Sequence, residues 1–147
     1  MALREDILQP VPGDNPSGRD LRYDKVYEDV KKARQQDDEL LTSGDWATAR
    51  KVADWKLVIK IGSEALATKS KDLQLAAWLT EALINDQGVN GLTDGLVLIK
   101  GLLENFWDTV FPELEDGEAE FRAGPLDWVG GHYLTLPVKK VGLTPVT

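Results

Sequence analysis

The sequence contains few side chains that could perform chemistry, and its composition excludes several kinds of site. The 147 residues include no cysteine and one histidine, His132, so disulfides, thiolate metal sites and clusters of histidine ligands cannot form within the chain. The common motifs of nucleotide-binding proteins, zinc proteases and serine hydrolases are missing as well. His132 follows Gly130-Gly131 in an expected loop, which favours an exposed residue over a member of a catalytic triad.

Asp108 is the strongest candidate for a catalytic acid. Acid–base catalysis by a carboxyl group usually requires an apolar pocket that raises its pKa, and Asp108 directly follows Phe106 and Trp107. The simpler interpretation is that Asp108 accepts a hydrogen bond from a nearby backbone group or helix end. The sequence therefore favours a protein that is not an enzyme and holds no cofactor and no metal. A small helical enzyme or ligand-binding domain, using Asp108 or an acidic cleft, is the alternative.

A weaker signal points to an anion site. Lys69 and Lys71 flank Ser70 at the expected start of a helix, where free backbone N–H groups attract negative charge. No glycine-rich loop accompanies these residues, so the signal has little specificity.

The charge distribution suggests a protein partner more than a nucleic acid or a membrane. The net charge is −8 and the isoelectric point is near 4.6, whereas nucleic acids and anionic membranes attract basic patches. Residues 104–127 carry eight acids against one base, Arg122. This stretch is either a solvated acidic face or a docking surface for a basic partner. Its candidate binding residues are Glu113, Glu115, Asp116 and Glu118.

The five tryptophans divide into two groups. Trp55, Trp78 and Trp107 lie on apolar stripes and are expected in the core. Trp46 and Trp128 lie where the apolar pattern is poor, so each either packs under a loop or anchors a partner, as exposed aromatic residues often do.

A nearly apolar helix over residues 69–85 is expected at the centre of the fold. Ser70 is expected to accept a hydrogen bond from a first-turn amide, and Asp72 places negative charge at the positive end of the helix dipole. Two adjacent apolar stripes leave a narrow polar ridge of Gln74, Glu81 and Asn85. A helix of this kind is usually buried by other helices.

Four further helices are expected around it. The first begins near residues 20–24, with the buried stripe Tyr23, Val26, Tyr27, Val30 and Ala33. The second is capped by Asp54 and runs to Ala67. After a stop at Gly88, Asn90 caps the next helix, which ends before Pro112 and buries Leu92, Leu96, Ile99, Leu103 and Phe106. A short helix passes through residues 121–129.

These elements predict an all-α fold, a compact bundle of about five to six helices. Residues 1–20 are expected to form an irregular N-terminal segment, residues 21–133 a helical domain, and residues 134–147 a tail leading to a missing C-terminal region. No apolar stretch approaches a signal sequence or a membrane span, so a cytoplasmic protein without direct membrane insertion is expected.

Several segments in one order resemble the ImpA-type N-terminal domain of TssA-like proteins of the bacterial type VI secretion system. The first is Asn15-Pro16-Ser17-Gly18 with Asp20-Leu21-Arg22-Tyr23-Asp24. The others are Ala53-Asp54-Trp55, Ser70-Lys71-Asp72-Leu73 with Ala77-Trp78-Leu79 and Glu81-Ala82, and Gly88 with Gly91-Leu92 and Gly95-Leu96, closing on Phe106-Trp107-Asp108 and Pro112. The resemblance covers about residues 10–145.

The resemblance implies a non-catalytic structural part that takes part in assembly of the secretion tail. Its implied partners are baseplate, sheath, tube or membrane-complex proteins, with homo-oligomerisation through the missing C-terminal region. The matching residues are implied to be mainly structural. A related sheath-anchoring protein has the same kind of N-terminal domain and is an alternative within this class.

Overall fold

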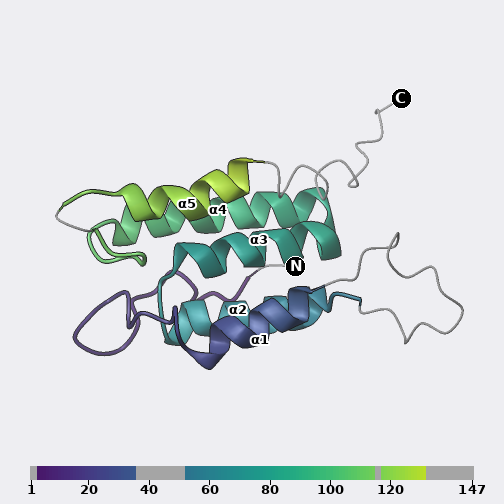
Figure 1. The fold of residues 1–147 in the computed structure, drawn as a ribbon, viewed down its shortest axis with the longest axis horizontal. Coiled ribbons are helices and arrows are strands. Elements are labelled where there is room, and N and C mark those ends of the chain that lie inside the picture. Colours follow the sequence, from purple (N-terminus) through teal and green to yellow (C-terminus); the bar gives the residue numbers. More distant parts are fainter. Residues whose placement is uncertain (1–2, 36–51, 115–116, 132–147) are drawn as a thin grey trace, which may run out of the picture.

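The computed structural model describes residues 3–35, 52–114 and 117–131, and these hold five α-helices (Figure 1). The helices are α1 (Lys25–Arg34), α2 (Trp55–Thr68), α3 (Leu73–Gln87), α4 (Val89–Phe106) and α5 (Glu120–Gly130). The prediction of an all-α bundle is confirmed. Within the described ranges, none of the helices combines the length and apolarity that a membrane crossing requires.

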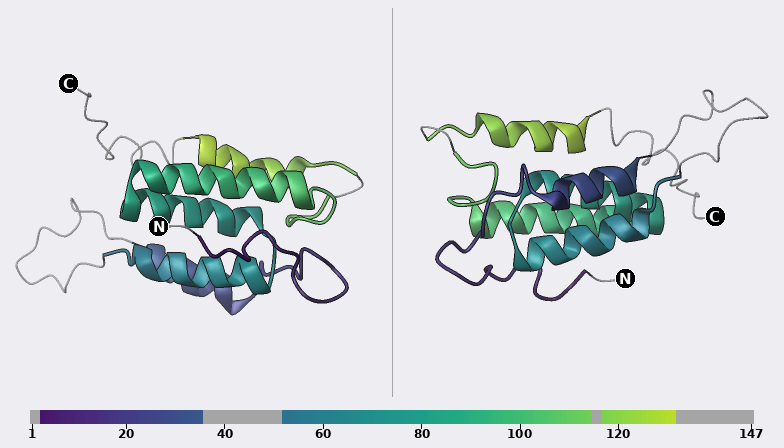
Figure 2. Two further views of the ribbon diagram at one scale, coloured as in Figure 1. Left: turned by 180° about the vertical axis from the view of Figure 1, so that it is seen from behind. Right: turned by 60° about the horizontal axis from the view of Figure 1, so that its bottom comes forward.

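Helix α3 is the centre of the bundle and contacts all four other helices. On one side it packs against α1 and α2, which also contact each other, and α4 and α5 each pack against it separately (Figures 1 and 2). Most of its residues are buried, including Leu75, Leu79 and Leu83. Trp78 is also buried and packs edge-on against Tyr27 of α1, with 5.1 Å between the ring centroids. The expectation of a central helix buried by its neighbours is therefore correct.

The start of α3 differs from the expectation. Asp72 caps the helix, because its side chain accepts a hydrogen bond from the Leu75 amide at 3.0 Å. The expected role for Ser70 is wrong: its hydroxyl oxygen is buried and has no hydrogen-bond partner among the described residues. The end of the helix is as expected, since Gly88 adopts a positive φ of 65° there.

The polar ridge expected on α3 is interrupted at Glu81. This carboxylate is buried, and its two oxygens accept hydrogen bonds from the Arg34 guanidinium of α1 at 2.8 and 3.0 Å. The Arg34 side chain also lies over the Trp128 ring of α5, 5.5 Å from its centroid. The expected solvent-facing acid is thus part of a contact that links α1, α3 and α5.

The buried face of α4 agrees only in part with the expectation: Ile99 and Phe106 are buried as expected, but the rest of the face differs. The helix begins at Val89, directly after Gly88, so Asn90 lies inside the helix and is not its cap. The buried face includes Gly91, Gly95, Leu98 and Leu102, whereas Leu96 is 49% exposed. A Cβ at Gly91 would lie 1.9 Å from the carbonyl oxygen of Leu83. The glycines therefore allow the α4 backbone to lie against α3, and this close approach decides which face is buried.

The first two helices begin at the aspartates that cap them. Asp24 accepts from the Val26 amide and Asp54 from the Leu57 amide. Tyr23, expected in the buried stripe of the first helix, precedes the α1 cap and is 93% exposed. Trp55 is partly buried against the core.

An extended link of residues 69–72 joins α2 to α3 and pairs with backbone on both sides. On one side Lys71 donates its amide to the Ser17 carbonyl at 2.7 Å, next to an antiparallel bridge between Gly18 and Ser70. On the other side the Phe111 amide donates to the Lys71 carbonyl at 2.9 Å. The link therefore brings the N-terminal segment and the loop after α4 to the start of α3.

Candidate functional site

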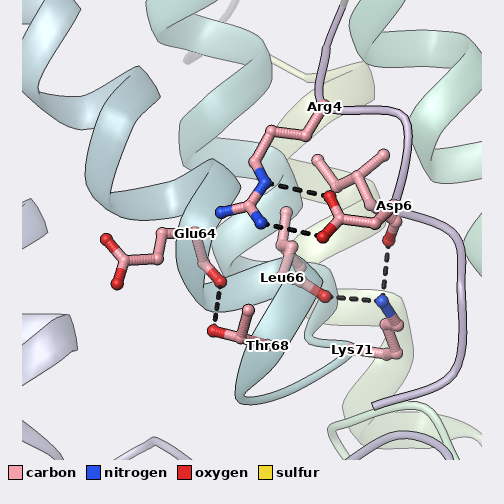
Figure 3. A network of polar contacts seen from close by, with 7 residues as sticks. Arg4, Asp6, Glu64, Leu66, Thr68 and Lys71 are labelled. Atoms are coloured by element: carbon pink, nitrogen blue, oxygen red, sulfur yellow. Dashed lines mark hydrogen bonds and ion pairs between the residues drawn. The ribbon is translucent and has the colours of Figure 1, made fainter.

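Three consecutive polar residues at the link between α2 and α3 are buried: Ser70, Lys71 and Asp72. Lys71 is fully buried, and its ammonium group donates to the backbone carbonyl oxygens of Ile7 at 2.7 Å and Leu66 at 2.6 Å. Burial lowers the pKa of Lys71 to about 8. Figure 3 shows the ammonium group directed at the carbonyl oxygen of Leu66, near an ion pair between Arg4 and Asp6. Lys71 is thus a structural contact, and the anion site expected around Ser70 does not form.

Asp72 is also buried and joins α3 to α1. One carboxylate oxygen caps α3, and the other accepts a 2.6 Å hydrogen bond from the Tyr27 hydroxyl. Burial raises the pKa of Asp72 to about 6, although the hydrogen bonds from Tyr27 and from the backbone of α3 partly oppose this shift. Burial next to this carboxylate also raises the pKa of Tyr27. Asp72 is the described acid whose environment most resembles that of a functional carboxyl group.

A pocket of about 450 Å³ opens beside this pair of residues, and we call it the Tyr27 pocket. It lies between the segment before α1, the start of α3, the loop after α4, and α5. Its apolar lining consists of Phe111, Pro112, Leu114, Phe121 and Pro125. Phe121 is 55% exposed and stands at the surface, whereas Phe111 is buried. The pocket therefore offers aromatic and aliphatic surface that a ligand or a protein side chain could cover.

Three of the six polar residues that line the Tyr27 pocket are acids: the polar lining consists of Asp20, Arg22, Tyr27, Asp72, Gln74 and Glu113. The one cationic side chain, Arg22, pairs with Asp20 at 3.4 Å. No salt bridge within the described ranges joins Asp72 or Glu113 to a basic side chain. The pocket thus has an excess of negative charge.

Arg122 of α5 connects this helix to the loop after α4. Its guanidinium donates to the carbonyl oxygens of Pro112 at 2.7 Å, Val110 at 2.8 Å and Trp107, and it lies over the Trp107 ring at 4.7 Å. The side chain is almost completely buried, and burial lowers the pKa of Arg122. Arg122, the single base within residues 104–127, therefore joins α5 to the loop after α4 through the hydrogen bonds of its buried side chain.

The structure places the expected aromatic and acidic residues in different environments. Trp107 is 43% exposed at the end of α4 instead of lying in the core, and its ring stacks on the Arg122 side chain. Trp128 is half-buried and covers Arg34. Glu113 and Glu118 are exposed. Trp46, Glu115, Asp116 and His132 lie outside the described residues.

The catalytic candidate Asp108 receives no support from the geometry. It is exposed at the end of α4 and does not line the Tyr27 pocket. In the described part of the chain, no group of three or more histidine, cysteine or acidic residues is placed to hold a metal ion. The Tyr27 pocket, in contrast, combines aromatic surface with negative charge, which suits a cationic group.

Comparison with known protein families gives a match over most of the chain. Residues 8–131 match the family model described as "ImpA, N-terminal, type VI secretion system". The chain belongs to the ImpA N-terminal family.

Two relatives show how this ImpA N-terminal domain compares with longer proteins. The type VI secretion system component TssA1 of Pseudomonas aeruginosa is 34% identical over 123 residues, which are 82% of this chain and 35% of TssA1. A solved structure from Burkholderia cenocepacia is described as the N-terminal domain including the conserved ImpA_N region of the TssA component. It has 39% identity and a TM-score of 0.72, and the match covers 86% of this chain and 45% of that one. The matched region thus spans less than half of either relative.

The family-motif residues of the ImpA N-terminal domain are used mainly for internal contacts. Asp54 and Asp72 cap helices, Lys71 binds backbone carbonyls, and Gly91 allows α3 and α4 to approach closely. Among the remaining motif positions, three are buried (Ser70, Leu73 and Trp78), two are partly buried (Trp55 and Pro112) and two are exposed (Trp107 and Asp108).

Sequence reasoning missed the Tyr27 pocket and the role of Arg122. The sequence predicts Tyr27 in a buried stripe and presents Arg122 only as a lone base among acids. A lone base within an acidic stretch, flanked by apolar residues, is the one signal that could have singled out Arg122. Nothing in the local sequence indicates that Tyr27, Asp72 and Phe121 meet, because they come from three different helices or caps.

Proposed function

We propose that this domain is a non-catalytic, cytoplasmic part of the type VI secretion machinery that makes protein contacts during assembly of the tail. The observation that carries the proposal is membership of the ImpA N-terminal family across residues 8–131. The internal use of the motif residues supports a structural role, since these side chains cap helices and bind backbone instead of lining a reaction site.

The contact surface that we propose surrounds the loop after α4 and the start of α5. Trp107 and Phe121 are partly exposed there, and Glu113 and Glu118 add negative charge at the surface. Exposed aromatic residues next to polar ones are common in protein interfaces. The partners that we propose are baseplate, sheath, tube or membrane-complex proteins, and the longer protein would oligomerise through a region beyond residue 147.

A binding experiment with the 147-residue chain tests this proposal. The chain would be immobilised and offered purified sheath, tube, baseplate and membrane-complex proteins. We expect capture of one component, and weaker capture by the double variant Glu113→Lys and Glu118→Lys. The matched control is Glu64→Lys with Glu104→Lys, which reverses two exposed acids on α2 and α4.

Two results would contradict parts of the proposal. If no component is captured, this domain alone does not provide an assembly contact. If both double variants lower capture equally, the effect reflects overall charge, and the surface around α5 is not the contact.

A further inference from the structure

We infer that the Tyr27 pocket binds an arginine side chain of a protein partner, with the guanidinium directed toward Asp72 and Glu113 and the aliphatic stem against Phe121. This inference rests on the proposed function, because it assigns the chemistry of the partner at one point of the contact. It goes further by naming the pocket and the side chain that it selects.

The volume and lining of the pocket suit a long side chain with a planar head group. A volume of about 450 Å³ exceeds that of one arginine, so the pocket can also admit the residue next to it. Tyr27 and Phe121 lie in its walls, and a planar guanidinium stacks well on aromatic rings. Phe121 is more than half exposed, so its ring is accessible without a rearrangement of α5.

The charge of the pocket favours a cation over an anion or a neutral group. Its walls carry the carboxylates of Asp20, Asp72 and Glu113 against one guanidinium, that of Arg22. Arg22 is paired with Asp20 at 3.4 Å, which leaves the other two acids without an ion-pair partner in the described structure. A bound cation would offset the cost of holding Asp72 ionised in a buried position.

Asp72 is held in place for this role by its neighbours. Its carboxylate is fixed between the Leu75 amide and the Tyr27 hydroxyl, so it requires little rearrangement to receive a cation. Each carboxylate oxygen can accept more than one hydrogen bond, so the oxygen that accepts from Tyr27 keeps acceptor capacity for a further donor. An arginine can provide several N–H donors from one planar group.

Titration with benzamidine tests the pocket without any secretion protein. Benzamidine is a planar cation on an aromatic ring, and benzamide is a neutral probe of nearly the same shape. Both would be added to the isotopically labelled 147-residue chain and followed by NMR. We expect benzamidine to bind about tenfold or more tightly than benzamide, with the largest shifts at the amides of Gln74, Leu114 and Phe121.

Four variants locate the binding site. Asp72→Asn and Glu113→Gln remove one charge each with little change of shape, and each is expected to weaken benzamidine binding by about threefold or more. Phe121→Ala should weaken both probes, and Glu104→Gln, on the outer side of α4, should change neither. If Asp72→Asn alters the fold, the exposed position Glu113 still provides the charge test.

The outcomes separate this inference from the proposed function. Equal binding of the two probes, no binding, or binding unaffected by Asp72→Asn and Glu113→Gln would each overturn the arginine site. Capture of a secretion protein without benzamidine binding would leave the proposed function intact. Benzamidine binding without capture of any secretion protein would support the pocket and contradict the proposed function.

Discussion

The ammonium nitrogen of Lys71 lies 2.7 Å from the backbone carbonyl oxygen of Ile7, a residue 64 positions earlier in the chain. The same nitrogen lies 2.6 Å from the carbonyl oxygen of Leu66, at the end of α2. A single side chain therefore connects the N-terminal segment, α2 and the start of α3. Because Ile7 and Leu66 are buried together with Lys71, water is not available to these two carbonyl groups as an alternative partner.

Lys71→Met should destabilise the domain by about 2 kcal/mol. The substitution retains the volume of the side chain but leaves two buried carbonyls without a donor, which costs about 1–3 kcal/mol for each group. Removal of a buried charge offsets part of this cost. The free energy of unfolding in urea measures the effect. Lys100→Met, at an exposed position of α4, is the control and should change stability by less than about 0.5 kcal/mol.

Asp72 should make the domain less stable as the pH rises from about 4 to about 7. Burial raises its pKa in the folded state from an ordinary value of 3.8 to about 6. Between these values the folded state binds more protons than the unfolded state, so stability falls with rising pH and levels off above about pH 6. The stabilising contribution of Asp72 is fully present below the pKa of the unfolded state, 3.8, and is lost as the pH rises through the folded-state pKa of about 6.

The comparison with Asp72→Asn isolates this effect from the other acids of the chain. The variant keeps an oxygen for the Leu75 amide and places an amide nitrogen where the Tyr27 hydroxyl can act as acceptor. The stability of the wild type relative to the variant should fall by about 1–3 kcal/mol from pH 4 to pH 7. Unfolding curves at several pH values measure this difference. A constant difference would show that Asp72 keeps its ordinary pKa.

Arg122→Met should destabilise the domain by about 3 kcal/mol. The guanidinium serves three backbone carbonyls, and the substitution leaves them without their donors. Arg122→Lys should recover only part of the loss, since an ammonium group cannot reproduce the planar fork of donors. Urea unfolding measures both variants. Arg19→Met is the control: it removes an exposed ion pair with Asp24 and should cost less than about 1 kcal/mol. An equal loss of stability in Arg19→Met and Arg122→Met would contradict the stabilising role of the Arg122 hydrogen bonds.

Gly91→Ala should be strongly destabilising, whereas Gly124→Ala should be neutral or stabilising. A Cβ at Gly91 would lie 1.9 Å from the Leu83 carbonyl oxygen, so α3 and α4 would have to separate. A Cβ at Gly124 in α5 meets nothing within 4 Å, and alanine is favoured over glycine in a helix by about 1 kcal/mol. Thermal unfolding of the two variants gives the comparison. Similar melting temperatures would show that the helices are not in contact at Gly91.

Much of the fold follows from patterns that are local in the sequence. Apolar residues at helical spacing predict the central helix and its neighbours, because one face of each helix must leave water. Asp54 and Gly88 mark helix ends through their own backbone and side-chain preferences, and the structure confirms both positions. The resemblance to a family also depends only on the order of residues along the chain.

The tertiary structure decided which polar residues are buried and which apolar residues remain exposed. Lys71, Glu81 and Arg122 are of types that normally face water, and each is buried because it bonds to groups on other elements of the fold. Leu96 is exposed because the glycines of α4, and not its leucines, allow the closest approach to α3. Periodicity describes one helix at a time, so it cannot identify these partners. The Tyr27 pocket forms for the same reason only when α1, α3 and α5 have packed together.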